Sequence, residues 1–313
     1  MHAFRLIPDD TRIRFMRFAT WAYAFSGVLV VLTLVLVPLK GLNFGIDFRG
    51  GILMEVRMPG AAADLGAMRA TLGQLGLGEV ALQEFGEPFD VLIRIERQQG
   101  DDEAQQAAIA AVRSALDQRF DGEISYRRVE FVGPKVSGEL FWAGTQAVVY
   151  ALLAILAYIW FRFEWQYAMG AIVALAHDTI TTVGLFALLG LEFNLASVAA
   201  LLTIVGYSLN DTVVIYDRVR ENLRKYKAMS ITELLDRSIN ETLARTVMTS
   251  GTTLLALLAL AIFGGPVIRG FTIAMIWGVL IGTYSTVYVA TPMLLHFHLP
   301  RAGEPAAAAA ETP

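Results

Sequence analysis

The sequence predicts an α-helical polytopic membrane protein with six transmembrane helices and a small external α+β domain between the first two. Of its 313 residues, 55% are hydrophobic and only 17% are charged, whereas a soluble domain carries about 25% charged residues. Six apolar stretches are long enough to cross a bilayer, which takes about 20 residues. The one other long segment, residues 40–138, alternates between strand-like and helix-like patterns.

The six apolar stretches set the predicted domain boundaries. The first, residues 18–39, is too long for the core of a signal peptide and is followed by no small-residue cleavage site, so it predicts an uncleaved anchor. The remaining five lie within residues 139–297, at 139–161, 166–190, 195–217, 244–264 and 267–297. Residues 298–313, with their alanine run, predict a disordered tail.

Positive charge is concentrated on one side of the predicted spans. The N-terminal segment 1–17 carries four arginines, and the loop after the fourth span carries six lysines and arginines. The short loops on the other side hold Arg269 alone. Because short cytoplasmic loops are enriched in Lys and Arg, both termini are predicted to face the cytoplasm and residues 40–138 to lie outside.

Residues 40–138 are predicted to fold in the order βαββαβ, the ferredoxin-like arrangement. Two helices are indicated by apolar residues at helical spacing, and the strands by alternation. In the last strand the alternation slips at Arg127 and Arg128, which predicts a β-bulge. No catalytic constellation is visible in this domain, so we expect it to serve recognition or positioning.

Ionisable residues inside the predicted spans are the main functional candidates, because a charge at the bilayer centre costs a few kcal/mol or more. Asp211 in the fourth span lies seven residues before Arg218, about 10 Å inside the cytoplasmic end of the helix. Burial and a nearby arginine act on a carboxyl group in opposite directions. An Asp–Arg pair that opens and closes with protonation would therefore move helices, and Arg245 stands at the start of the fifth span.

Four further residues are candidates for the same proton pathway, each with a structural alternative: Asn210, Asp178, His177 and Thr249. Asp178 fits either proton transfer or bracing of Asp211, and His177 fits a packing role equally well. The Thr249 hydroxyl can bond to its own helix, just as Arg245 can reach the cytoplasmic interface instead of Asp211.

Two helix faces are predicted to make extended contacts. Ala274, Gly278 and Gly282 are spaced four apart in the sixth span, a small-residue face that allows close helix approach. Residues 230–243 predict an amphipathic helix with a capping box. We expect that helix to lie on the cytoplasmic membrane surface beside the basic cluster.

Five segments carry a resemblance to a known family. They are GLNFGIDFRGG (41–51), FVGPKVSGEL (131–140), ALAHD (174–178), GYSLNDTVVIYDRVRENL (206–223) and SINETLARTVMTSGTT (238–253). Together and in this order they resemble the SecF family of protein translocase subunits, in the resistance-nodulation-division superfamily. The resemblance covers nearly the whole chain.

The resemblance implies a role in protein export. Members work with SecD beside the SecYEG channel, with YajC and YidC as further partners, in the bacterial inner membrane. They use the proton-motive force to help exported unfolded polypeptides leave the channel, and they need no cofactor, metal or nucleic acid. The resemblance assigns proton passage to Asp211 and Arg245.

Three other functions compete with protein export as explanations of the sequence. A proton-coupled exporter of small molecules or lipids from the same superfamily would need a larger external domain. A structural scaffold would not depend on the charge of Asp211. An enzyme is disfavoured because no Walker motif, metal-ligand cluster or activated nucleophile is visible in the sequence.

The glycine-rich turn after the first span is predicted to have a structural role. Gly45, Gly50 and Gly51 permit backbone conformations closed to other residues, and Asp47 and Arg49 can form local hydrogen bonds. The turn is therefore predicted to fix how the external domain joins the first span, either as an ordinary connector or as a hinge.

Overall fold

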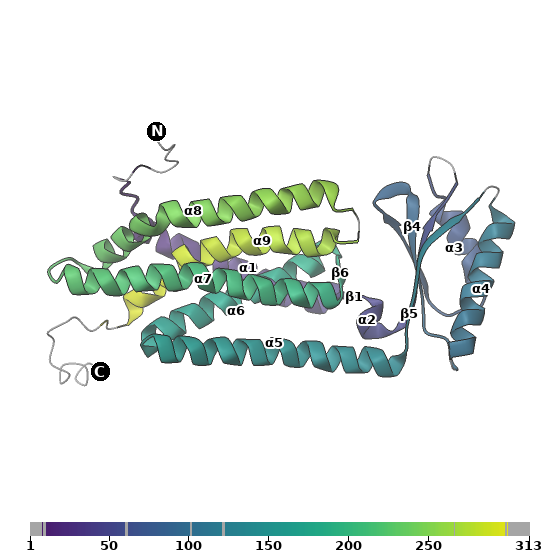
Figure 1. The fold of residues 1–313 in the computed structure, drawn as a ribbon, viewed down its shortest axis with the longest axis horizontal. Coiled ribbons are helices and arrows are strands. Elements are labelled where there is room, and N and C mark those ends of the chain that lie inside the picture. Colours follow the sequence, from purple (N-terminus) through teal and green to yellow (C-terminus); the bar gives the residue numbers. More distant parts are fainter. Residues whose placement is uncertain are drawn as a thin grey trace.

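The computed structural model describes residues 8, 11–59, 62–100, 102–120, 123–265, 267–297 and 299. A bundle of long helices forms one part of the molecule, and a small α+β domain stands at one end of it (Figure 1). The predicted disordered tail, apart from Leu299, and residues 1–7 lie outside the described residues.

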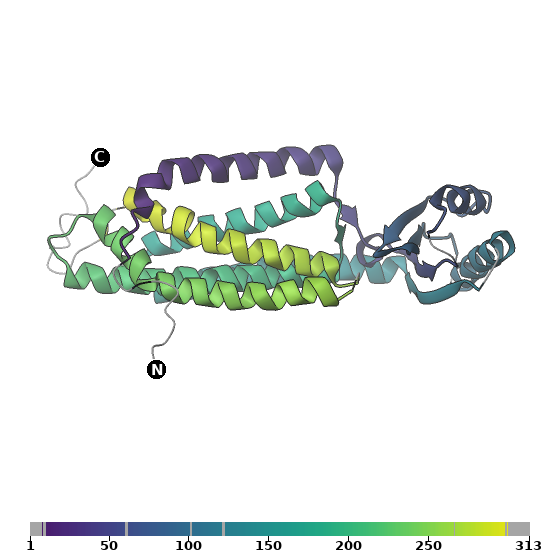
Figure 2. The ribbon, with the colours of Figure 1, turned by 90° about the horizontal axis from the view of Figure 1, so that it is seen from above.

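Six helices in the described chain are long and apolar enough to cross a membrane, which confirms the predicted fold class. They are α1 (Ala19–Lys40), α5 (Pro134–Arg162), α6 (Trp165–Leu189), α7 (Leu195–Lys225), α8 (Ile231–Phe263) and α9 (Arg269–Ser285). The 3-10 helix η1 (Phe15–Phe18) leads into α1. α6, α7 and α9 are half or more buried, whereas α1, α5 and α8 are mostly exposed and lie at the rim (Figures 1 and 2).

Small residues bring α9 close to α7. Ala274 is fully buried, a Cβ on Gly278 would overlap the side chain of Ile204, and one on Gly282 would lie 3.0 Å from the Cβ of Ser208. The predicted small-residue face of the sixth span therefore lies against α7. This close approach brings hydroxyl groups of α7 and α9 within hydrogen-bond distance of the same carboxylate, Asp178.

The sixth span is not one regular helix. After Ser285 the chain forms a π-helical turn, η2 (Thr286–Ala290), then a short α10 (Thr291–Met293) and the 3-10 helix η3 (Leu294–His296). Pro292 has no N–H to donate to the preceding turn, and the Thr286 carbonyl accepts from the Thr291 N–H and, at 2.7 Å, from the Thr291 hydroxyl. π turns are rare and frequently mark functional sites.

The amphipathic stretch at residues 230–243 is the first part of α8 and is continuous with the fifth span. Its apolar residues Leu234, Leu235 and Ile239 are buried in the main core of the bundle beside Phe15 and Met16. The prediction that this face lies on the membrane surface is therefore wrong. The N-terminal segment covers it instead: the Met16 N–H donates to Asp236 Oδ1 at 2.8 Å, and the Ile13 N–H to Asn240 Oδ1 at 2.9 Å.

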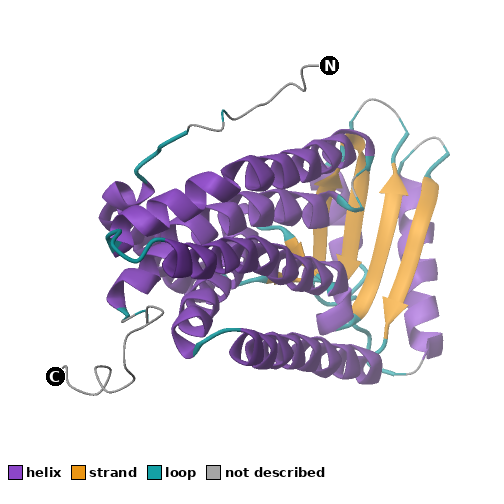
Figure 3. Ribbon diagram, turned by 60° about the vertical axis from the view of Figure 1, so that its left-hand side comes forward, coloured by secondary structure: helices purple, strands orange, loops and turns teal. Residues whose placement is uncertain are grey.

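The domain predicted to be external, called the external domain below, is a four-stranded antiparallel sheet with two helices on one face. Its elements are β2 (Gly51–Arg57), α3 (Leu65–Gly73), β3 (Val80–Phe85), β4 (Glu87–Ile95), α4 (Asp102–Arg119) and β5 (Ser125–Val132), and the strand order is β3-β4-β2-β5. The strands on either side of each helix are thus separated by one other strand. α3 and α4 cover the sheet face that points away from the bundle (Figures 1 and 3).

The register of β5 contains the expected irregularity. Glu55 pairs with Arg128 and Val56 with Tyr126, so Arg127 is the extra residue of a β-bulge. The bulge was predicted from the slipped alternation of this strand. Its effect is to direct Arg127 towards Asp90, with Nη1 3.3 Å from Oδ2.

Asp90 in β4 makes the external domain sensitive to acid. The Arg57 guanidinium donates two 2.7 Å hydrogen bonds to its carboxylate and holds the pKa of Asp90 below its usual range, with Arg127 adding to the effect. A group with a lowered folded-state pKa contributes stability above its unfolded value, about 3.9, and loses it as the pH falls through the folded pKa. We expect Asp90→Asn to raise amide hydrogen exchange in β4 at pH 7, and the difference from wild type to shrink at a pH well below the unfolded value of about 3.9. Exchange in the full chain, corrected for intrinsic rates, measures this; an equal difference at both pH values would contradict it.

A second, two-stranded sheet lies where the two parts meet. β1 (Asn43–Phe44) follows α1, and β6 (Glu192–Phe193) follows α6; they pair in parallel, Asn43 with Glu192 and Phe44 with Phe193. The same letters, Gly-Leu-x-Phe, begin at Gly41 and at Gly190. Each of these glycines has a positive φ and stands directly after its helix. We call this pair of strands the junction sheet.

Candidate functional site

A buried carboxylate joins three helices at the centre of the bundle. Asp178 on α6 is fully buried, and its Oδ2 accepts hydrogen bonds from Ser208 of α7 at 2.6 Å and Ser285 of α9 at 2.7 Å. Its Oδ1 lies 3.0 Å from Nδ1 of His177. Both oxygens of Asp178 therefore have partners within the bundle.

Hydroxyls from α7 and from the π turn extend this cluster. The Thr212 and Thr286 hydroxyl oxygens are 2.9 Å apart, and Thr212 also donates to the Ser208 carbonyl at 3.1 Å. Sequence reasoning did not select Ser285 and Thr286. The available signal was a short hydroxyl-rich run, residues 283–286, in an otherwise apolar span.

Asp211 has a different environment. It lies on α7, three residues after Ser208, with 2% of its surface exposed, and its Oδ2 has no hydrogen-bond partner. The Thr246 hydroxyl on the neighbouring helix α8 is also buried without a partner. An unpaired buried charge is costly. Asp211 differs from Asp178 because its Oδ2 is still free to bind a proton or a cation.

Three of the predicted pathway residues form no hydrogen bond with either carboxylate in the described part of the chain. Arg245 is exposed on α8; it is near enough to act electrostatically on Asp211, yet no hydrogen bond joins it to the free oxygen. Asn210 is exposed on the outer side of α7. The Thr249 hydroxyl donates to the carbonyls of Arg245 and Thr246, so it bonds to its own helix.

Two separate arrangements are thus present within the spans. Asp178 accepts hydrogen bonds that join α6, α7 and α9, and His177 contacts it through Nδ1 while the His177 Nε2 is buried without a hydrogen-bond partner. Asp211 lies one helical turn after Ser208 on α7 and has an oxygen without a hydrogen-bond partner. Arg245 lies near it on the exposed face of α8. Within the described ranges no group of three or more His, Asp or Glu side chains could hold a metal ion.

The glycine-rich turn after α1 forms the short helix α2 (Ile46–Arg49) and closes onto the start of α7. Asp47 Oδ2 accepts a hydrogen bond from the Leu195 N–H in the first turn of α7 at 2.9 Å. A Cβ on Gly45 would stand 2.5 Å from Oε1 of Glu192, and Gly51, at φ +110°, would bring a Cβ to 2.6 Å from the Ile95 carbonyl. Gly50 also has a positive φ, and Arg49 is exposed. The glycines permit close approach between the turn, the junction sheet and the external sheet.

Two family models match this chain. One is Protein export membrane protein SecD/SecF, C-terminal, which matches residues 112–299, and the other is the SecD/SecF GG Motif, which matches residues 35–58. The chain belongs to the SecD/SecF family. The match to the second model covers the glycine-rich turn.

Curated SecD/SecF relatives resemble the chain over nearly its whole length. Protein translocase subunit SecF of Rickettsia rickettsii (strain Sheila Smith) is 46% identical over 297 residues, covering 95% of this chain and 96% of the relative. Protein translocase subunit SecF of Rhodobacter capsulatus is 47% identical over 310 residues, covering 95% and 92%. The resemblance read from the sequence motifs is therefore confirmed.

A crystal structure in the SecD/SecF family has the same fold. SecDF from Thermus, described as a translocon-associated membrane protein, aligns with a TM-score of 0.82 at 36% identity. The alignment covers 92% of this chain and 39% of the SecDF chain. The chain thus spans about two fifths of that longer protein.

Proposed function

We propose that this chain is a SecF subunit of the Sec protein-export machinery. It pairs with SecD in the bacterial inner membrane and uses the proton-motive force to help exported polypeptides leave the SecYEG channel on the outer side. The support for an export role is the 46% identity, over 95% of the chain, to a protein named for it. In this role the chain is a transport subunit and not an enzyme.

The observation that carries the proton-driven part is the state of Asp211. It is a buried carboxylate within a membrane-spanning helix, with an oxygen that has no hydrogen-bond partner. A membrane protein retains such a group at a cost of a few kcal/mol. Proton binding and release give that group a use which helix packing does not.

The remaining polar residues take distinct parts in this proposal. Arg245 approaches Asp211 when the carboxylate is charged and leaves it when a proton arrives, which moves α8 relative to α7. One charge crossing 100 mV supplies about 2.3 kcal/mol for such a step. Asp178 and His177 keep α6, α7 and α9 aligned while α8 moves.

The outer faces of α7 and α8 support pairing with SecD. Asn210 and Arg245 are exposed within predicted membrane spans, where hydrocarbon offers no hydrogen-bond partners. A second set of helices bearing polar groups would satisfy them. SecYEG, YajC and YidC as partners, and cytoplasmic termini, rest on the family resemblance and on the arginine and lysine distribution.

Export of a secreted reporter in cells depleted of their own subunit tests the proposal. This chain should restore export, and a protonophore should remove the restored part. If export is restored equally with and without the gradient, the proton-driven role is wrong. If export is not restored at equal membrane levels, a small-molecule or lipid exporter becomes the better hypothesis.

A further inference from the structure

One arginine of the external domain reaches the membrane helices. Arg94 lies on β4, and its Nη1 donates to Asn43 Oδ1 at 2.8 Å while its Nη2 contacts Glu192 Oε2. Both side chains are largely buried, with 17% of Arg94 and 23% of Glu192 exposed. Among the ion pairs of the described residues, this one joins the external sheet to the helical bundle.

The two acceptors belong to the junction sheet. Asn43 follows α1, pairs with Glu192 across the two strands and donates from Nδ2 to the Gly190 carbonyl at 3.2 Å. Glu192 stands between the end of α6 and Asn194, which caps the start of α7. The contact of Arg94 is thus made to the short rigid segment that connects α6 with α7.

That segment continues directly into the helices of the candidate site. α6 carries Asp178 and α7 carries Asp211. A displacement of either helix along its axis moves Glu192, and a buried ion pair resists separation because breaking it leaves an unpaired charge. The pair with Arg94 therefore passes the displacement to β4.

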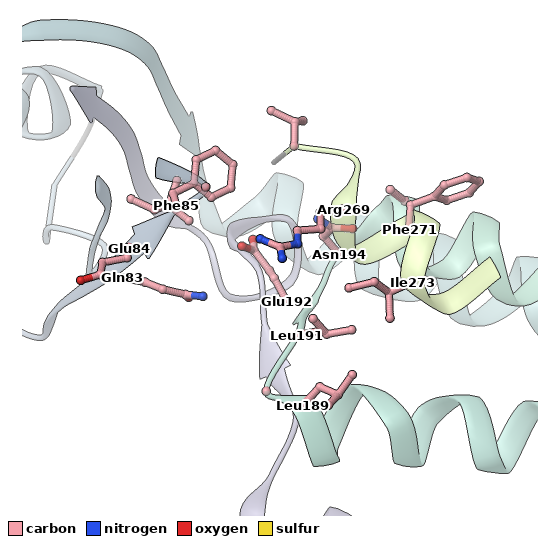
Figure 4. A pocket seen from close by; sticks show the side chains of 16 residues that line it. Gln83, Glu84, Phe85, Leu189, Leu191, Glu192, Asn194, Arg269, Phe271 and Ile273 are labelled. Carbon is pink, nitrogen blue, oxygen red and sulfur yellow. The ribbon is translucent and has the colours of Figure 1, made fainter. Parts of the chain in front are cut away.

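Cavities lie on both sides of this contact. A cavity of about 300 Å³ lies between Phe85 of the external sheet and Arg269 and Glu192 of the bundle, as Figure 4 shows. A second cavity, of about 730 Å³, lies on the other side of Arg94, next to Asn43. Ile46 of α2 packs against Leu53 and Leu92 of the external sheet, so the Arg94 pair adds a charged contact to an apolar one.

We propose that Arg94 is the positioning residue that couples the external domain to α6 and α7, by binding Glu192 and Asn43 of the junction sheet. The use of this coupling in export rests on the proposed function. Gly45 belongs to the same device, since a Cβ there would stand 2.5 Å from the Glu192 carboxylate and displace it.

A charge exchange tests the contact itself. The variants are Arg94→Glu, Glu192→Arg and the two combined, with Arg97→Glu as the matched control because Arg97 is exposed near the end of the same strand. The chain has no cysteine, so Gln118→Cys and Phe263→Cys provide the two sites for spin labels. The distance distribution between them should be narrow in wild type and in Arg97→Glu, broad in each single variant and narrow again in the exchange. A narrow distribution in Arg94→Glu, or a broad one in the exchange, would overturn the proposal.

Export and proton entry then separate this inference from the proposed function. In vesicles with SecD and the channel, Arg94→Glu should lower gradient-dependent export by about tenfold, a usual size for coupling between sites, while proton entry continues. Arg94→Lys, which keeps the charge but not the forked geometry, should give intermediate export and shows whether a loss of folding is responsible. If export by wild type ignores the gradient, the proposed function fails while the distance measurement still decides the contact.

Discussion

Asp211→Asn is expected to lower gradient-dependent export by about tenfold or more, with insertion and assembly unchanged. Asparagine keeps the size of the side chain and removes only its ability to ionise. Because the Oδ2 of Asp211 has no hydrogen-bond partner to lose, the exchange should cost little stability. The measurement is export of a reporter with and without a protonophore, at equal membrane levels of wild type and variant.

Asp217→Asn is the matched control for this experiment. Asp217 lies on the same helix and forms an ion pair with Arg162 at 2.9 Å, with 45% of its side chain exposed. An exposed pair of this kind contributes at most about 1 kcal/mol, so export should stay at the wild-type level. If Asp211→Asn also keeps full sensitivity to the gradient, the proton site lies elsewhere in the chain or in its partner.

The features that the sequence could predict are those carried by composition and regular spacing. Apolar runs of bilayer length predicted six spans, and a charged residue inside such a run, like Asp178 or Asp211, is visible without any structure. The bulge at Arg127 was readable because one slipped residue breaks a strict alternation. The roles of these residues are not settled by the same pattern, since it does not show which carboxylate has donors nearby.

Features built from long-range contacts left no such signal. The strands of the junction sheet have two residues each and come from positions about 150 apart in sequence, too short for any periodicity. Arg94 occupies an ordinary polar position in an alternating strand, and only the fold places Glu192 opposite it. The π turn depends on how the Thr291 hydroxyl and Pro292 redirect the backbone.

The first part of α8 shows a limit of another kind. An apolar stripe with a capping box predicts an amphipathic helix, but the same stripe can lie on lipid or on protein. In this chain Leu234 and Leu235 are fully buried in the core. The N-terminal segment that covers them carries too few residues to predict a partner from its own pattern.

Asp178→Ala is expected to destabilise the bundle rather than to uncouple it. The change removes the acceptor of Ser208 and Ser285 and the neighbour of His177. Hydrogen bonds between membrane helices average about 0.6 kcal/mol each, so three lost contacts amount to about 2 kcal/mol, with the cavity adding to the loss. Unfolding of the detergent-solubilised full chain by a denaturing detergent measures the difference.

Asp178→Asn separates bracing from proton transfer. The amide keeps an oxygen that the two serine hydroxyls can reach, but it cannot ionise. If Asp178 braces the bundle, the asparagine variant should regain most of the stability lost in Asp178→Ala and retain gradient-dependent export. Loss of gradient dependence in a stable Asp178→Asn protein would instead make Asp178 a proton carrier, in series with Asp211 one turn away on the facing helix. The hydrogen bonds at Asp178 and the free oxygen at Asp211 favour the first result, because the two serine hydroxyls need an acceptor oxygen at residue 178 and not a charge.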